Sequence, residues 1–493
     1  GFTYARYPRP AAGAALSPFD VALYHHRLGT AAARDSAVFG PGYSAVAEYR
    51  LIGSDGNRRA ALLANDGDGS FAEVYLRTPR GWNRVADTTF GVREAAFIGD
   101  RLVAIASGRA PHGRLIAFAP NGDTATLVPE GPRVMKGIAP VAGGFLLTTV
   151  WGMDWRVDHY SAAGTLLHNL KLPAGIAISG VASSARSPEA VVAFDGWTIP
   201  GRWVRYDARR GTVTRIFDVQ AAGDYSRISA RQFEVVSADG AHVPVTVLTL
   251  RGTPQDGSAP AILSSYGGFQ LPVTPTFVGP DLAWLERGGI LAYANIRGGD
   301  EFGETWHQAQ MRTRKQHAFD DFYAAARGLV DEHWTTEGHL GIFGRSNGGL
   351  LMGTALTQHP EAYRAAVAFV GIYDMMRHPE TPNGRYNIPE YGSADDSAQF
   401  AAQYAYSALY HVVQGVAYPA VLLETGENDP LVAPWQSREF AAALQGASSS
   451  GRPVLLLTRF GAGHGASSFA QQLGNAGITL TFFAHELGLK EER

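Results

Sequence analysis

The sequence predicts two domains of different fold class: an all-β domain, followed by a doubly wound α/β domain with a mostly parallel sheet. Its 493 residues are too many for one ordinary domain and suit two large ones. The first half carries a weak repeat of about 40–45 residues, and the second half alternates apolar strands with helical segments. We therefore assign residues 1–225 to the all-β domain and residues 226–493 to the α/β domain.

Between residues 40 and 220, short apolar runs alternate with turn signals such as Asn65-Asp66-Gly67-Asp68-Gly69. Similar strand segments recur at 73–76, 114–117, 156–160 and 202–206, each followed by a turn and a further apolar strand. This spacing is typical of four-stranded propeller blades, and about four blades are predicted. An array of β-sandwiches is the alternative.

The second half predicts strands separated by helices such as 319–330. The expected strands are 233–236, 243–250, 261–263, 290–294, 340–343, 365–370, 420–424 and 453–458. Alternation of strand and helix indicates a mostly parallel sheet with helices on both faces.

Composition narrows the function classes. The formal net charge of -3 gives no excess of basic residues for binding nucleic acid. The sequence contains no run of about 18 apolar residues, so no membrane-spanning helix is predicted. The absence of cysteine excludes disulfides and thiolate chemistry, and no motif calls for a metal or another cofactor. The chain begins at Gly1 without Met or a signal-peptide pattern, so we expect that its true N-terminus is missing, and cytoplasm and periplasm both stay open.

The most informative motif is Gly344-Arg345-Ser346-Asn347-Gly348, which follows an apolar strand and precedes a helix. This order of strand, tight turn and helix is the context of a nucleophile elbow. Flanking glycines allow the sharp turn and the approach of a substrate carbonyl. The motif predicts Ser346 as a nucleophile.

A serine hydroxyl needs a base, and the base needs a carboxylate that orients it. In an α/β-hydrolase the chain order is Ser, then Asp or Glu, then His. Asp429 follows the strand at 420–424, and His464 follows the strand at 453–458 in a glycine-rich loop. We predict Asp429 and His464 as the partners of Ser346, with Glu427 as the rival acid.

The oxyanion needs two preorganised donors. One is predicted to be the backbone N–H of Asn347, which follows the nucleophile. The other is expected from Tyr266-Gly267-Gly268-Phe269, after the strand at 261–263, either as a backbone N–H or as the Tyr266 hydroxyl.

Several segments together resemble the prolyl oligopeptidase family of serine peptidases (family S9). They are Gly344 to Leu351, Asn295 to His307, Lys315-Gln316 with Phe319 to Phe322, Tyr266 to Phe269, and Gly463-His464-Gly465. The resemblance implies a seven-bladed propeller over an α/β-hydrolase domain and the triad Ser346, Asp429 and His464. It makes the Tyr266 hydroxyl the second oxyanion donor and implies that the propeller admits short peptides only. It also implies roughly 200 further residues before Gly1, which would supply the missing blades, so the chain is expected to be a fragment or a piece of a cleaved protein.

Two positions depart from the family pattern. Asn387 stands where the family has a Trp that stacks on the substrate proline, with Tyr386 as a neighbouring substitute. Leu431 stands where the family has an Arg that grips a substrate carbonyl. The remaining pocket positions agree with the family; they are Phe269, Ile372, Tyr391 and Val432. We therefore expect an altered or relaxed preference for the residue before the cut.

The leading interpretation is a monomeric serine peptidase that hydrolyses short peptides through an acyl-enzyme. An esterase or amidase on small acyl substrates is the alternative, because a fold and a triad do not set the substrate. A non-catalytic propeller that serves protein interactions is the third hypothesis.

Overall fold

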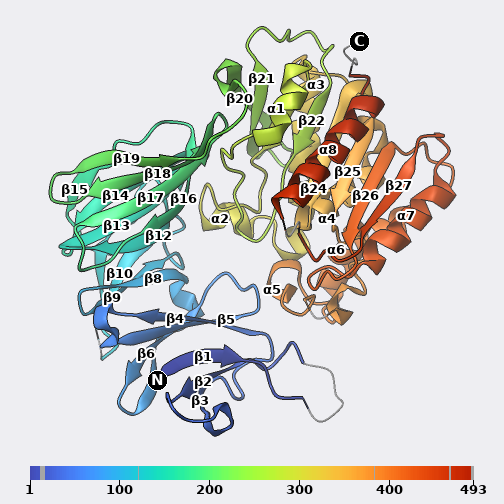
Figure 1. Ribbon diagram of the computed structural model, residues 1–493. Helices are drawn as coiled ribbons and strands as arrows, with labels where there is room; N and C mark the ends of the chain where they lie inside the picture. The colour runs from blue at the N-terminus through green and yellow to red at the C-terminus, as the bar shows by residue number, and fades with distance from the viewer. Residues whose placement is uncertain (11–16, 120, 382, 466–467, 490–493) are drawn as a thin grey trace.

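The computed structural model describes residues 1–10, 17–119, 121–381, 383–465 and 468–489. Within these residues the chain forms five small antiparallel sheets and then one eight-stranded sheet (Figure 1). The small sheets contain β1 (Phe2–Arg6), β2 (Ala22–His26) and β3 (Ser36–Phe39); β4 (Ala47–Gly53), β5 (Ala60–Asp66), β6 (Glu73–Thr78) and β7 (Gly81–Ala86); β8 (Val92–Ile98), β9 (Arg101–Ala106), β10 (Arg114–Phe118) and β11 (Thr124–Val128); β12 (Val134–Val141), β13 (Gly144–Trp151), β14 (Asp154–Ser161) and β15 (Leu166–Asn169); β16 (Ile176–Ala182), β17 (Glu189–Gly196), β18 (Ile199–Asp207) and β19 (Thr212–Asp218).

These sheets are the blades of a β-propeller, and the predicted count of about four is wrong by one. Four sheets have four strands each, and the fifth, β1-β2-β3, has three. The extra sheet escaped the sequence pattern because its strands are only four or five residues long and none of the residues of β1 or β3 is fully buried. Such strands show little of the apolar alternation that marks the other blades.

The eight-stranded sheet has the order β20-β21-β23-β22-β24-β25-β26-β27. Its strands are β20 (Ile228–Val236), β21 (His242–Leu250), β22 (Ala261–Ser264), β23 (Ile290–Ala294), β24 (Leu340–Arg345), β25 (Ala365–Phe369), β26 (Ala420–Gly426) and β27 (Val454–Arg459). The β20–β21 and β21–β23 pairings are antiparallel and every later pairing is parallel. The expected mostly parallel sheet is therefore confirmed.

Helices cover both faces of this sheet. The helices of the domain are α1 (Leu282–Glu286), α2 (Glu304–Gln308), α3 (Gln316–Asp331), α4 (Asn347–Gln358), α5 (Ile388–Tyr391), α6 (Ser397–Tyr406), α7 (Trp435–Ala447) and α8 (Phe469–Glu486). Residues of α3, α4 and α7 share one buried cluster, and residues of α1 and α8 share the other. Successive residues of β25 belong to different clusters, Ala366 to the first and Val367 to the second, as expected for a strand that is buried on both faces.

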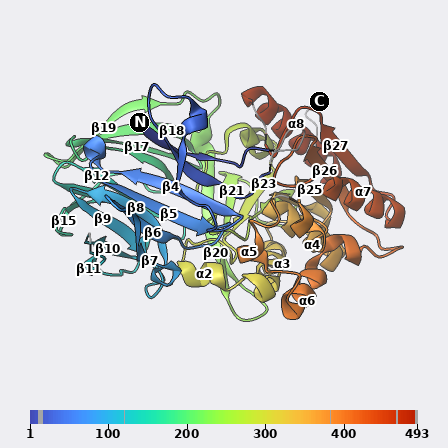
Figure 2. The ribbon, with the colours of Figure 1, turned by 90° about the horizontal axis from the view of Figure 1, so that it is seen from below.

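The propeller and the α/β domain touch along one side, where α2 and α5 lie between them (Figures 1 and 2). Trp197, in the turn after β17, stacks on Tyr293 of β23 with ring centroids 4.6 Å apart. Asp300 of the α/β domain pairs with Arg93 and Lys136 of the propeller. Among the described residues, no helix is long and apolar enough to cross a membrane.

Candidate active site

Ser346 occupies the sharp turn between β24 and α4. Its backbone has φ 58° and ψ -118°, and its N–H donates to the carbonyl of Phe369 at 2.9 Å. A positive φ is uncommon for a residue other than glycine and is the strained geometry of a nucleophile elbow. A Cβ on Gly344 would lie 2.1 Å from the carbonyl oxygen of Gly348, so the turn closes only with glycine there.

Asp429 and His464 meet at the carboxyl ends of β26 and β27. The Nδ1 atom of His464 lies 2.8 Å from Oδ2 of Asp429. The Asp429 side chain is buried and accepts the backbone N–H groups of Leu431 and Val432 at 2.9 and 3.0 Å. These bonds fix the carboxylate, which in turn orients the imidazole ring through its Nδ1 atom. The rival acid Glu427 pairs with Arg438 instead.

Arg345 holds the histidine loop against the serine turn. Its guanidinium donates a hydrogen bond to the backbone carbonyl of His464. Arg345 is the last residue of β24 and directly precedes Ser346. One side chain therefore links the segment that carries the serine to the segment that carries the imidazole.

Tyr266 lies beside the serine at the end of β22. Burial raises the pKa of the Tyr266 phenol, and hydrogen bonding with the Ser346 side chain and the Asn347 backbone opposes that rise. The Tyr266 ring lies next to the serine turn, because a Cβ built on Gly348 would come within 3.8 Å of its Cδ2 atom. A hydroxyl and a backbone N–H that converge beside a serine can together accept a developing oxyanion.

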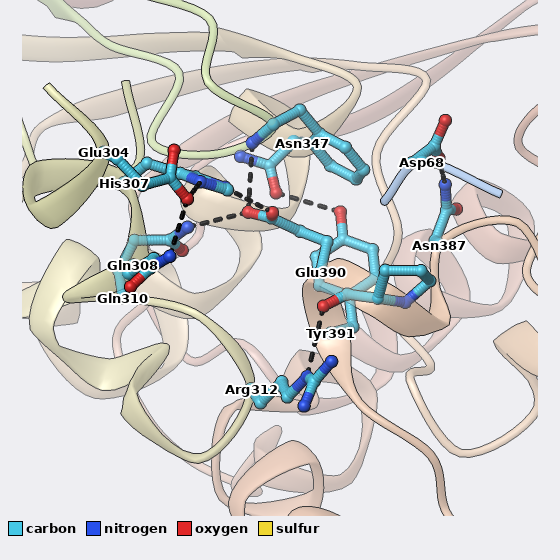
Figure 3. Close-up of polar contacts among 12 residues, drawn as sticks. Asp68, Glu304, His307, Gln308, Gln310, Arg312, Asn347, Asn387, Glu390 and Tyr391 are labelled. Carbon is cyan, nitrogen blue, oxygen red and sulfur yellow. Dashed lines mark hydrogen bonds and ion pairs between the residues drawn. The ribbon is translucent and has the colours of Figure 1, made fainter. Parts of the chain in front are cut away.

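The segments that carry these two donors are joined to each other and to α5. Figure 3 shows the contacts that Glu390 and Tyr391 of α5 make. The Asn347 side chain donates to the carbonyl of Tyr266 at 2.5 Å and accepts the Tyr391 hydroxyl at 2.9 Å. Glu390, next to Tyr391, accepts the backbone N–H of Phe269 at 3.0 Å. Helix α5 thus contacts both segments.

Glu390 is a buried carboxylate in a dense polar network. It accepts from His307 at 2.8 Å and from Gln310 at 2.7 Å, and Nζ of Lys315 lies 3.6 Å away. Burial acts to raise the pKa of Glu390, but the His307 bond and the Lys315 charge outweigh it and hold the pKa at about 2. Burial lowers the pKa of Lys315 to about 8. Glu390 is therefore a fixed negative charge at neutral pH.

The predicted pocket positions fall into two groups. Ile372, Tyr391 and Val432 are almost fully buried in one apolar cluster, and Phe269 packs against it with its ring edge-on to Tyr391 at 5.4 Å. Leu431 is 41% exposed and lines a cavity of about 520 Å³ between the propeller and the α/β domain, together with Tyr386. The cavity wall is thus apolar where the family has a charged side chain.

Asn387 and Tyr386 both contact the propeller. Asn387 is buried, and its side-chain amide donates to the carboxylate of Asp68. The Tyr386 hydroxyl donates to the carbonyl of Pro18 at 2.7 Å, and its ring stacks on Phe19. These contacts tie both side chains to propeller residues.

Sequence reasoning missed Asp68, Glu390 and Lys315. Asp68 lies in a turn whose chemistry fully explains its sequence, and nothing local indicates a partner more than 300 residues away. Lys315 lies inside a segment that carried the family resemblance, and Glu390 directly precedes the predicted pocket residue Tyr391. A charged residue in a short segment is ordinarily exposed, so neither was expected to be buried. Only the tertiary packing brings these three residues close to the candidate active site.

The fold and the strand–Ser–helix turn define a serine hydrolase of the α/β-hydrolase class with a propeller. The family model described as the prolyl oligopeptidase family matches residues 276–490. The chain is 30% identical over 505 residues to the prolyl endopeptidase of Elizabethkingia meningoseptica, covering 99% of this chain and 71% of that protein. It is 29% identical over 517 residues to prolyl oligopeptidase A of Galerina marginata, covering 99% and 70%.

A solved prolyl endopeptidase structure matches with a TM-score of 0.95 and 29% identity, covering 99% of this chain and 74% of that one. The chain therefore belongs to the prolyl oligopeptidase family and is a serine-type peptidase.

Proposed function

We propose that this peptidase hydrolyses short peptides through an acyl-enzyme, with Ser346 as nucleophile, His464 as general base and Asp429 as its orienting carboxylate. The observation that carries the proposal is the 2.8 Å contact between His464 and Asp429 at the strand ends next to the strained Ser346 turn. The proposed enzyme acts as a monomer, because each proposed catalytic group comes from this one chain.

The proposed reaction follows from these roles. His464 takes the proton of Ser346 as the hydroxyl oxygen attacks the peptide carbonyl, and Asp429 stabilises the imidazolium. The Tyr266 hydroxyl and the Asn347 N–H donate to the oxyanion. His464 then gives the proton to the departing amine, and water, activated by the same ring, releases the acid product.

The proposed preference for the residue before the cut is relaxed relative to strict cleavage after proline. Asn387 offers no aromatic face, and its amide is engaged by Asp68. Loss of a stacking aromatic should cost about 0.5–1.5 kcal/mol of substrate binding beyond the buried area. Leu431 cannot donate the charged hydrogen bond of an Arg, a loss of about 1.5–3 kcal/mol. Cleavage after proline remains within this proposal, but not as the sole specificity.

The proposed restriction to short peptides rests on the propeller. It contacts the α/β domain at Asn387, which directly precedes α5, and at Asp300, which precedes α2. We expect these contacts to hold the propeller against the α/β domain and to hinder the approach of a folded protein to Ser346.

Covalent labelling tests the catalytic assignment. A fluorophosphonate probe should label the wild-type enzyme at one serine, and Ser346→Ala should abolish the label. Asp429→Asn should slow labelling by about 10³–10⁴-fold while leaving the fold intact, because the imidazole then loses its orientation and its counter-charge. Labelling of folded Ser346→Ala at the wild-type rate would refute the assignment.

A further inference from the structure

The turn between β5 and β6 extends from the propeller into the α/β domain. The backbone N–H of Asp68 donates to the carbonyl of Tyr386 at 2.8 Å. Gly67 has φ 55°, and a Cβ there would lie 2.5 Å from the same carbonyl oxygen, so the approach requires glycine. Asn65 braces the turn by donating from its side chain to the carbonyl of Gly69 at 2.8 Å.

The Asp68 carboxylate accepts a hydrogen bond from the buried side-chain amide of Asn387. Asn387 donates to Asp68 from Nδ2, while its Oδ1 accepts from Nε2 of His378 at 2.9 Å and from Asn383 at 3.2 Å. Asn387 is 4% exposed, so water cannot replace these partners easily. Both ends of the amide are used, which fixes its orientation.

Helix α5 begins immediately after Asn387 and is only four residues long. It carries Glu390 and Tyr391, which hold the backbone N–H of Phe269 and the side chain of Asn347. A displacement of Asn387 must therefore be carried into the two segments that bear the Tyr266 and Asn347 donors.

We propose that Asp68 of the propeller is a positioning residue for the oxyanion site and acts through Asn387 and α5 (Figure 3). The inference rests on the oxyanion role proposed above for Tyr266 and Asn347. It makes the docked propeller part of the catalytic geometry, because one of its turns fixes the start of α5. In this proposal Asp68 acts indirectly and contacts neither Ser346 nor the reacting atoms.

Steady-state kinetics on a fluorogenic short peptide test the proposal. Asp68→Ala should lower kcat by about tenfold, the size expected for one charge-assisted hydrogen bond, with KM changed less than twofold. Asp68→Asn keeps an acceptor oxygen and should recover most of kcat. Asp66→Ala is the matched control, because Asp66 lies in the same turn, is exposed, and bonds Ser44 within the propeller.

A double-mutant cycle tests the route. If Asp68 acts through Asn387, then Asp68→Ala should have little further effect on kcat in an Asn387→Ala background. Losses that multiply, an unchanged kcat in folded Asp68→Ala, or an effect on KM alone would each overturn the proposal.

The two proposals fail differently. If wild-type enzyme is not labelled at Ser346 by the fluorophosphonate, the proposed function fails. If wild-type enzyme is labelled and active but Asp68→Ala matches it in kcat, only the positioning role fails.

Discussion

At the scale of single residues, Tyr266 is the proposed oxyanion donor that can be removed without altering the backbone. Its side chain is half-buried beside the Ser346 turn, and burial raises the pKa of the phenol. The other donor, the N–H of Asn347, belongs to the main chain and is untouched by substitution at Tyr266. The two contributions can therefore be separated.

Tyr266→Phe should lower kcat by about 10²–10³-fold with little change in KM, because the lost hydrogen bond forms mainly in the transition state. Peptide hydrolysis kinetics measure this. Tyr363→Phe is the matched control, since Tyr363 is buried and its hydroxyl has no partner among the described residues. Equal kcat in Tyr266→Phe and wild type would contradict the oxyanion role.

The buried carboxyl group of Glu301 should make the stability of the folded protein depend on pH. Its side chain is fully buried, Oε1 accepts from Asn295 at 2.6 Å, and Oε2 has no partner in the described part of the chain. Burial raises the pKa of Glu301 from 4.5 to about 8. Because the folded pKa lies above the unfolded one, the stabilisation is fully present below about pH 4.5 and is lost as pH rises through about 8.

At pH 8.5 the unfolding free energy of Glu301→Gln should therefore exceed that of the wild type by about 1–3 kcal/mol, and its melting temperature should be higher. At pH 5 the two proteins should differ little. Thermal melts at the two pH values measure this. The exposed Glu361→Gln serves as control. A wild-type advantage that grows with pH would show that Glu301 is ionised in the folded protein.

At the scale of elements, the β24–α4 turn is tightly constrained while α8 is not. A Cβ at Gly344 would meet the backbone 2.1 Å away, whereas a Cβ at Gly474 of α8 meets nothing within 4 Å. Gly344→Ala should destabilise the protein by about 1–3 kcal/mol or more and displace Ser346.

Gly474→Ala should stabilise the protein by about 0.5–1 kcal/mol, because alanine loses less backbone entropy in a helix. Denaturant melts and labelling rates compare the two variants. The account of the turn would be wrong if Gly344→Ala matched wild type in both.

The strands of the α/β domain could be predicted almost completely from the sequence. Each expected strand overlaps an observed one, because strands of a parallel sheet are continuous apolar runs bounded by turns. Parallel topology then brings Asp429 and His464 together, since each follows the carboxyl end of a neighbouring strand. The three-stranded blade and the Asp68–Asn387 contact could not be predicted, because the first has weak alternation and the second depends on how two domains dock.

At the scale of the whole molecule, buried ion pairs join the propeller to the α/β domain. Asp300 is 2% exposed and lies 2.8 Å from Arg93 and 2.5 Å from Lys136. Removing Asp300 would leave Lys136 without this partner and Arg93 with Glu304 alone.

Asp300→Ala should cost about 3–5 kcal/mol and make the interface between the domains more susceptible to protease. Calorimetry and limited proteolysis measure this. Glu189→Ala, which breaks the half-exposed pair with Arg205, should change stability by less than about 1 kcal/mol. Equal melting of the two variants would contradict the importance of the Asp300 contact.

The most direct test of the central claim is cleavage of a mixed library of short peptides, read by mass spectrometry, with Ser346→Ala as the blank. We expect cuts after proline and after other residues, and none with Ser346→Ala. Cuts confined to proline would contradict the relaxed preference assigned to Asn387 and Leu431. Cuts that persist with Ser346→Ala, or no cuts with the wild-type enzyme, would contradict the proposed peptidase mechanism itself.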